Sequence, residues 1–153
     1  MMDNRQCPCS GSRQRNPIVH LTDHGPEPYA LNLAKATRDN RMFRTALWTG
    51  KHLQLTVMNI NPGQEIGLEM HPDTDQMLYV EDGHGMVRMG KEKDNLDFRT
   101  NVFVDDAFLV PAGYWHNVIN SGVRPLKLFS VYAPPEHPRG TVHATKEDAE
   151  EQH

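Results

Sequence analysis

The sequence has no long apolar run, and this absence restricts where the protein can act. No stretch approaches the ~20 consecutive apolar residues that a membrane-spanning helix needs. Residues 1–7 are polar and contain no hydrophobic segment of the kind found in secretory signal peptides. We therefore expect a cytoplasmic protein that does not contact a membrane.

The chain also lacks an excess of basic residues. It has 16 lysines and arginines against 20 aspartates and glutamates, so its formal net charge is −4. Proteins that bind nucleic acid need clustered positive charge to contact the phosphates. The charge balance therefore predicts no nucleic-acid partner.

Cysteine is scarce. Cys7 and Cys9 are the only two, and they flank a proline in the polar N-terminal segment. A disulfide across a single residue would be strained, and a reducing compartment would disfavour it. The pair is then either a two-thiolate metal or redox site or two free thiols. Because no nearby residue completes a four-ligand zinc site, we interpret them as free thiols.

A chain of 153 residues suits one compact domain, and its composition divides it into three sections. Residues 1–28 are polar with few bulky apolar groups, which predicts a mostly disordered leader. Residues 29–137 carry the apolar patterns and would form the domain. Residues 138–153 are interpreted as a polar, acidic, solvated tail.

Within the domain, one short helix is expected before a series of strands. Leu31 and Ala34 are at helical spacing, and the helix should end near residues 39–40. From residue 43 onward, short apolar or alternating segments are separated by turn residues. His52 to Ile60 alternates and predicts a half-buried strand. The fold class expected is all-β, as an antiparallel sandwich or barrel with one N-terminal helix.

Two apolar segments contain the polar residues best suited to chemistry. Glu69 and His71 are two positions apart, so on a strand both side chains leave the same face. His116 lies in a second apolar segment. A single buried histidine in a β-protein is more often a core residue than a ligand. Two histidines and a carboxylate from two strands favour a metal site.

The two segments resemble the paired motifs of the cupin superfamily. The first motif is usually written G-(X)5-H-X-H-(X)3,4-E-(X)6-G, and residues 63–83 keep this spacing. The second is usually written G-(X)5-P-X-G-(X)2-H-(X)3-N, and residues 111–120 match it from the proline onward. The likeness extends over roughly residues 43–133. It is to small single-domain cupins of the cupin-2 type, some of which are labelled mannose-6-phosphate isomerase-like.

The resemblance implies a double-stranded β-helix, a small jelly-roll barrel with a metal ion in its mouth. It also implies a homodimer, because cupins commonly pair through their sheets. The implied metal ligands are Glu69, His71, Gln76 and His116. Here Glu69 stands where the motif has its first histidine and Gln76 where it has glutamate, so the number of carboxylates is unchanged. Gln76 is then either a fourth, weaker ligand or an outer hydrogen-bond donor.

The ligand types leave the metal open. Two histidines and one carboxylate form the facial triad of non-haem Fe(II) oxygenases. The same residues can hold Mn, Zn or Ni as a Lewis acid. We therefore expect one divalent transition metal among Fe, Mn, Zn and Ni.

Our leading hypothesis is a metal-binding cupin that acts on a small oxygen-rich molecule, as an isomerase or epimerase or as a non-haem dioxygenase. The alternative is a non-catalytic cupin that binds or senses a small ligand. A third interpretation is a purely structural dimerising barrel. Any metal-free barrel would have to bury Glu69 without compensation, which is costly unless the side chain stays solvated or protonated.

Overall fold

The computed structural model describes residues 20–151, so Cys7 and Cys9 lie outside the described residues. The helices are α2 (Leu33–Asp39) and α3 (Lys146–Glu151). The strands are β1 (Arg44–Thr49), β2 (Gln54–Ile60), β3 (Glu69–Met70), β4 (Asp75–Asp82), β5 (Gly85–Gly90), β6 (Phe98–Val102), β7 (Ala107–Val110), β8 (Trp115–Ile119), β9 (Leu126–Ala133) and β10 (Val142–His143).

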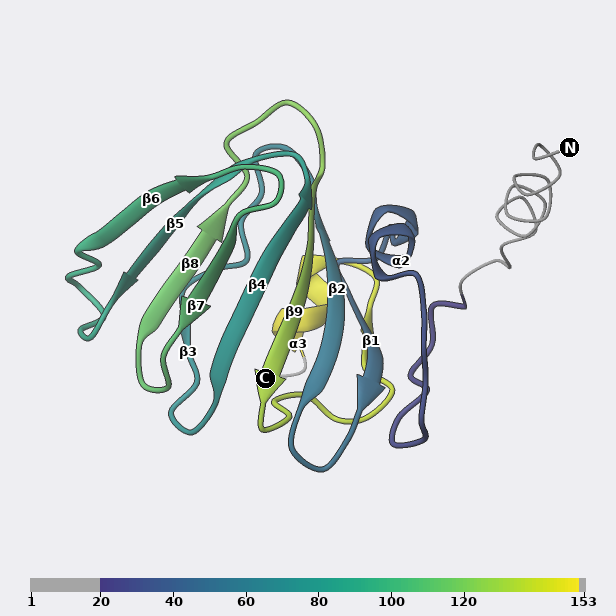
Figure 1. The fold of residues 1–153 in the computed structure, drawn as a ribbon. Helices are drawn as coiled ribbons and strands as arrows, with labels where there is room; N and C mark the ends of the chain where they lie inside the picture. The colour runs from purple at the N-terminus through teal and green to yellow at the C-terminus, as the bar shows by residue number, and fades with distance from the viewer. Residues whose placement is uncertain (1–19, 152–153) are drawn as a thin grey trace, which may run out of the picture.

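Two antiparallel sheets make up the body of the protein (Figure 1). The larger has the strand order β10–β1–β2–β9–β4–β7, and the smaller has the order β3–β8–β5–β6. Non-consecutive strands are neighbours in both sheets, so the chain crosses repeatedly from one sheet to the other. The all-β prediction is confirmed, with a second short helix that the sequence did not predict.

The main core lies between the two sheets because each strand alternates its side chains. In β4, Leu78 and Val80 are fully buried, whereas Met77 and Tyr79 on the other face are only half-buried. Alternation with a period of two is the geometry of a strand with one face on the core. The same cluster contains Met58, Ile60, Val87, Val118, Leu126 and Leu128.

Strand β2 differs from its prediction because both of its faces are covered. Its Val57 packs in a second cluster with Ala36 of α2 and Leu47 of β1. The polar Gln54 and Thr56, which lie on the opposite face, are also fully buried. A helix covering the outer face of the sheet explains why alternation alone predicted a strand only half-buried.

Residues 20–28, which the sequence assigned to the leader, are held against the domain by Asp23. Its carboxylate accepts hydrogen bonds from the Thr49 hydroxyl at 2.6 Å, the Thr49 amide at 3.0 Å and the Gly140 amide at 2.9 Å. Burial raises the pKa of Asp23, but these bonds, the Gly25 amide and the charge of Arg139 lower it more, so the net shift is downward.

The C-terminal section also differs from its prediction as a solvated tail. Val142 and His143 form β10 beside β1, and Ala149 of α3 is buried against the main core. The helix begins with a capping arrangement, in which the Asp148 amide donates to the Thr145 hydroxyl and the Thr145 amide to the Asp148 carboxylate, both at 3.2 Å. One alanine in an acidic segment gave too weak a periodic signal to predict this docking. Among residues 20–151, no helix is both long and apolar enough to cross a membrane.

We predict that Asp23→Asn destabilises the protein at neutral pH. Hydrogen bonds to a charged group contribute about 1.5–3 kcal/mol, and we expect the lower part of this range because Asp23 is only half-buried. A carboxyl whose pKa is lowered on folding adds stability above its unfolded pKa, and that stability is lost as the pH falls through its folded pKa. Urea unfolding at pH 7 and near pH 3 should therefore show a difference between wild type and variant that shrinks in acid. An equal difference at both pH values would contradict this account.

Candidate metal centre

The two motif segments pair directly with each other in the smaller sheet. In the antiparallel ladder between β3 and β8, Glu69 lies opposite His116. The ladder continues on both sides, because the Ile66 amide donates to the Val118 carbonyl at 2.9 Å and the Gly113 amide to the His71 carbonyl at 2.9 Å. Gly113 has a φ of 85°, a left-handed conformation that favours glycine, and it forms the turn before His116.

This pairing brings Glu69, His71 and His116 together. One ligand atom of each lies within 4.8 Å of the others. The distances are 3.8 Å from Glu69 Oε1 to His71 Nε2 and 3.9 Å from Glu69 Oε2 to His116 Nε2. Two metal–ligand bonds of ~2.1 Å span at most about 4.2 Å, so these separations are consistent with a transition-metal ion between the atoms. The group can hold a metal ion.

Each histidine has an oxygen acceptor beside its Nδ1, and this contact determines which ring nitrogen carries the proton. His116 Nδ1 lies 3.1 Å from the Tyr114 carbonyl oxygen, and His71 Nδ1 lies 3.2 Å from Glu136 Oε2. Carbonyl and carboxylate oxygens only accept hydrogen bonds, so in the neutral rings both protons are on Nδ1. The Nε2 lone pairs of both histidines therefore face the Glu69 carboxylate.

With both rings neutral, three electron-rich groups therefore meet at one point. His116 is only 2% exposed, and its buried Nε2 has no hydrogen-bond partner among residues 20–151. Leaving such an atom unsatisfied costs about 1–3 kcal/mol. A cation at this point would satisfy the lone pairs and offset the repulsion between them.

Gln76 lies on β4, in the larger sheet, and is 4% exposed. Its amide nitrogen donates to the Ser130 hydroxyl at 2.8 Å. Its carbonyl oxygen is buried without a hydrogen-bond partner in the described part of the chain. That free acceptor is compatible with either role expected for Gln76, as a fourth ligand or as an outer group.

Tyr132 packs against the ring of His71. The two rings meet edge to face with their centroids 5.8 Å apart, and Tyr132 is fully buried. Burial raises the pKa of Tyr132, although the positive charge of Arg44 lowers it in part. The phenol is therefore neutral at physiological pH and retains its proton.

A cavity of about 440 Å³ opens onto this group. Besides Glu69 and His71, it is lined by four charged residues that sequence reasoning missed, Arg44, Glu136, Lys146 and Glu150. Arg44 begins β1, Glu136 follows the last long strand, and Lys146 begins α3. No motif spacing links these positions, so no sequence signal could have placed them at the site.

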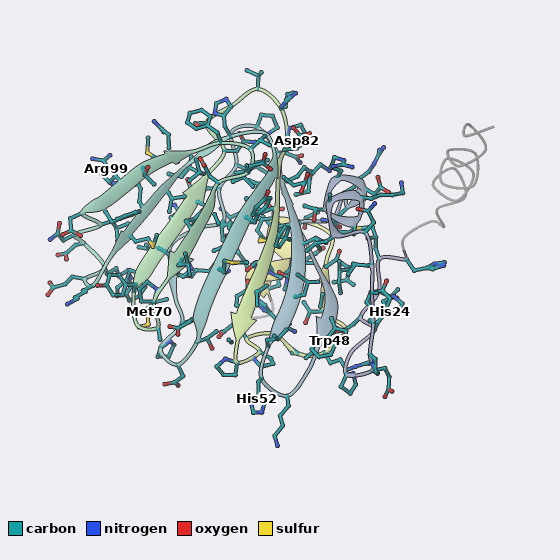
Figure 2. The ribbon with its side chains drawn as sticks, viewed as in Figure 1. His24, Trp48, His52, Met70, Asp82 and Arg99 are labelled. Carbon is teal, nitrogen blue, oxygen red and sulfur yellow. The ribbon has the colours of Figure 1, made fainter. Side chains whose placement is uncertain are left out.

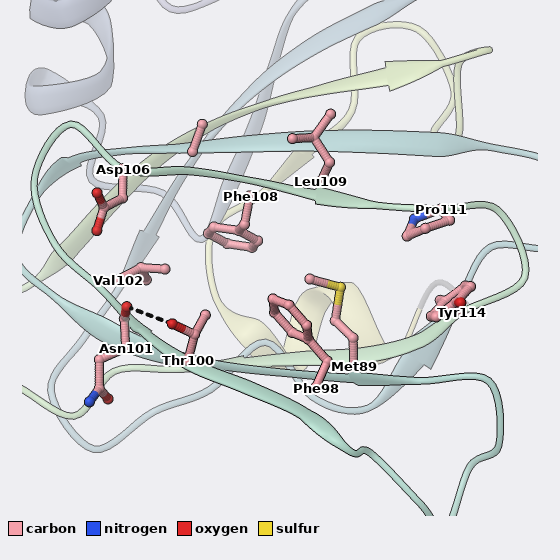
Figure 3. Close-up of a pocket in the computed structure, with 11 residues that line it drawn as sticks. Met89, Phe98, Thr100, Asn101, Val102, Asp106, Phe108, Leu109, Pro111 and Tyr114 are labelled. Carbon is pink, nitrogen blue, oxygen red and sulfur yellow. Dashed lines mark hydrogen bonds between the residues drawn. The ribbon is translucent and has the colours of Figure 1, made fainter.

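A larger cavity, of about 620 Å³, lies between β6 and β7 (Figure 3). Its walls are mostly apolar, with Met89, Phe98, Val102, Phe108 and Leu109 among them. None of the four expected metal ligands lines it. His52 is exposed in the turn between β1 and β2 (Figure 2).

Comparison with known proteins agrees with this architecture. Residues 56–132 match the cupin domain family. The chain belongs to the cupin family. It is 60% identical to the Bacillus subtilis (strain 168) protein YrkC over 129 residues, which cover 84% of this chain and 69% of YrkC.

Solved structures support the same assignment. The crystal structure of the Bacillus halodurans protein BH2720 has 59% sequence identity and a TM-score of 0.84, covering 85% of this chain and 98% of that chain. A Klebsiella pneumoniae protein with a double-stranded β-helix domain shares the fold at 21% identity and a TM-score of 0.60, covering 78% of this cupin and 100% of that chain. The predicted double-stranded β-helix is thereby confirmed.

We predict that Glu136→Ala weakens metal binding by about 10–100-fold, because carboxylates that hold a ligating histidine contribute this much to affinity. Isothermal titration of the chelator-treated protein with Zn²⁺ measures the effect. Glu150→Ala is the matched control, since it removes a carboxylate from the same cavity. Equal affinities in the two variants would show that the contact with His71 does not matter.

Proposed function

We propose that this cupin binds one divalent transition metal through Glu69, His71 and His116, with Gln76 as a fourth ligand or an outer group. In the same proposal, the metal and the adjoining cavity bind a small oxygen-rich molecule and convert it. Fe, Mn, Zn and Ni remain the candidate metals, because imidazole and carboxylate suit all four.

One observation carries the proposal: the lone pairs of His71 Nε2 and His116 Nε2 face the Glu69 carboxylate, at 3.8 Å and 3.9 Å from its oxygens. A metal-free barrel would gain nothing from this arrangement and would bear its electrostatic cost. The Tyr114 carbonyl and Glu136 hold both rings in this orientation, which would keep the ligands ready for the ion.

The chain would supply binding and orientation around the metal. Glu69, His71 and His116 would hold the metal, which when bound would supply Lewis-acid chemistry, or oxygen chemistry if it is iron. The cavity has room for a small ligand beside the triad.

We expect the protein as purified to contain close to one metal ion per chain, and the His71→Ala/His116→Ala double variant to contain little. Removing two of three strong ligands leaves a carboxylate that cannot hold a transition metal alone. Elemental analysis of both proteins measures this. The metal should also raise the melting temperature, since a ligand at 1,000 times its dissociation constant adds about 4.1 kcal/mol.

The control is His52→Ala/His84→Ala, which removes two exposed histidines and should leave metal content unchanged. Circular dichroism shows whether each variant is folded. Full metal retention in the folded double variant at residues 71 and 116 would overturn the proposal. Product formation from sugars or aromatic diols would separate a catalytic cupin from a non-catalytic sensor. The homodimer and the cytoplasmic location stay predictions.

A further inference from the structure

Arg44 is the one strongly basic side chain buried at the cavity beside the triad. It is 2% exposed, and it lines the cavity together with Glu69 and His71. Taking an arginine out of water is costly unless an anion or a full set of hydrogen bonds compensates the charge. The surroundings of Arg44 therefore show whether the protein itself supplies that compensation.

The protein compensates Arg44 only in part. Its Nη1 lies 3.1 Å from His143 Nδ1, and its Nη2 lies 4.0 Å from the Met58 sulfur, a weak acceptor. The guanidinium also hydrogen-bonds the neutral Tyr132 hydroxyl and lies 5.4 Å from the centre of the Phe43 ring, and neither group brings a negative charge. Within residues 20–151 its Nε has no hydrogen-bond partner, and its guanidinium forms no ion pair with a carboxylate. Since arginine only donates, His143 accepts through an unprotonated Nδ1 and adds no negative charge.

The rest of the cavity has a charge pattern that suits an anion once a metal is present. Three carboxylates and two cationic side chains line it, namely Glu69, Glu136, Glu150, Arg44 and Lys146. A divalent ion would turn their formal charge of −1 into +1. Glu69 would be engaged by the metal and Glu136 by His71. The exposed Glu150 would then be the one remaining carboxylate beside the two cations Arg44 and Lys146, so a net positive charge is left for a ligand.

Lys146 supplies a second cation from a different element. It begins α3, and its side chain comes within 3.8 Å of the position that a Cβ on Gly67 would occupy. The amine thus reaches across the cavity toward the segment that leads into β3. Arg44 and Lys146 are contributed by β1 and α3, so the docked C-terminal section completes this wall.

We propose that Arg44 anchors an oxyanion of the ligand, a carboxylate or phosphate group, beside the metal, with Lys146 at the opening. A guanidinium presents paired N–H donors that match the two oxygens of such a group. The inference rests on the proposed function for the neighbouring metal, and it narrows the oxygen-rich ligand to an anion. Arg44 would act as a binding residue that sets which molecules enter and how they lie.

The test measures dissociation constants for four small probes by titration calorimetry or NMR. Acetate, succinate and inorganic phosphate are the oxyanions, and acetamide is the neutral counterpart of acetate. Each is titrated into the metal-loaded and the chelator-treated protein, with metal content measured in the same samples. We expect wild type to bind at least one oxyanion and not acetamide, and the preferred probe to distinguish a carboxylate from a phosphate ligand.

The variants assign that binding to Arg44. Arg44→Met should weaken it by about tenfold or more, because the buried charge that pairs with the anion is lost. Arg44→Lys keeps the charge but lacks the paired donors, so we expect an intermediate loss. Lys146→Met should have a smaller effect, because Lys146 is only partly buried.

Arg88→Met is the matched control. Arg88 lies on β5, also has a buried Nε without a hydrogen-bond partner in the described residues, and does not line the cavity. If Arg44→Met fails to fold by circular dichroism, Arg44→Lys and Lys146→Met still test the proposal.

Three results would overturn the inference: no oxyanion bound by wild type, equal binding of acetamide and acetate, or unchanged affinity in the folded Arg44 variants. Loss of oxyanion binding in Arg44 variants that retain their metal supports it. The metal proposal fails separately, if wild type contains no metal while the oxyanion still binds through Arg44.

Discussion

One carboxylate oxygen and two imidazole nitrogens converge on a single point. The rest of the candidate site is arranged around these three atoms. Glu69 faces His116 because β3 and β8 pair in a fixed antiparallel register. A shift of one residue would turn every side chain of the short strand to the other face of the sheet. Hydrogen bonds from residues flanking β3 hold the register, including that of the Gly113 amide to the His71 carbonyl. The fold thereby maintains three ligand atoms in an arrangement that can hold a metal ion.

Two sets of residues surround the three ligand atoms: those that contact the histidine rings and those that place charge along the cavity. Glu136 and the Tyr114 carbonyl fix the ring orientations, and Tyr132 packs against the ring of His71. Arg44 and Lys146 then place positive charge along the cavity. A metal with a carboxylate ligand and a buried guanidinium nearby favours a ligand that carries both a coordinating oxygen and a negative charge. The metal and the Arg44 guanidinium would thus bind the same ligand in one cavity.

The two large cavities divide the barrel into chemically different regions. The one between β6 and β7 is mostly apolar (Figure 3). The one beside the triad is lined by five charged side chains, those of Arg44, Glu69, Glu136, Lys146 and Glu150. This separation follows from the sheets, because the triad lies at the β3 end of the smaller sheet and the apolar cavity at its β6 edge. Helix α3 contributes Lys146, Ala149 and Glu150 to the lining of the charged cavity.

The sequence by itself predicted the β-rich class, the helix before β1 and the grouping of Glu69, His71 and His116. Strand alternation, helical spacing and motif spacing can all be recognised from the order of residues along the chain. The tertiary structure decided the remainder. Residues 142–151 dock although they are polar, since one buried alanine and a helix cap are enough when a sheet edge is available. Arg44, Glu136 and Lys146 reach the site from segments with no shared spacing, and only the crossing of strands between two sheets brings such distant residues to one cavity.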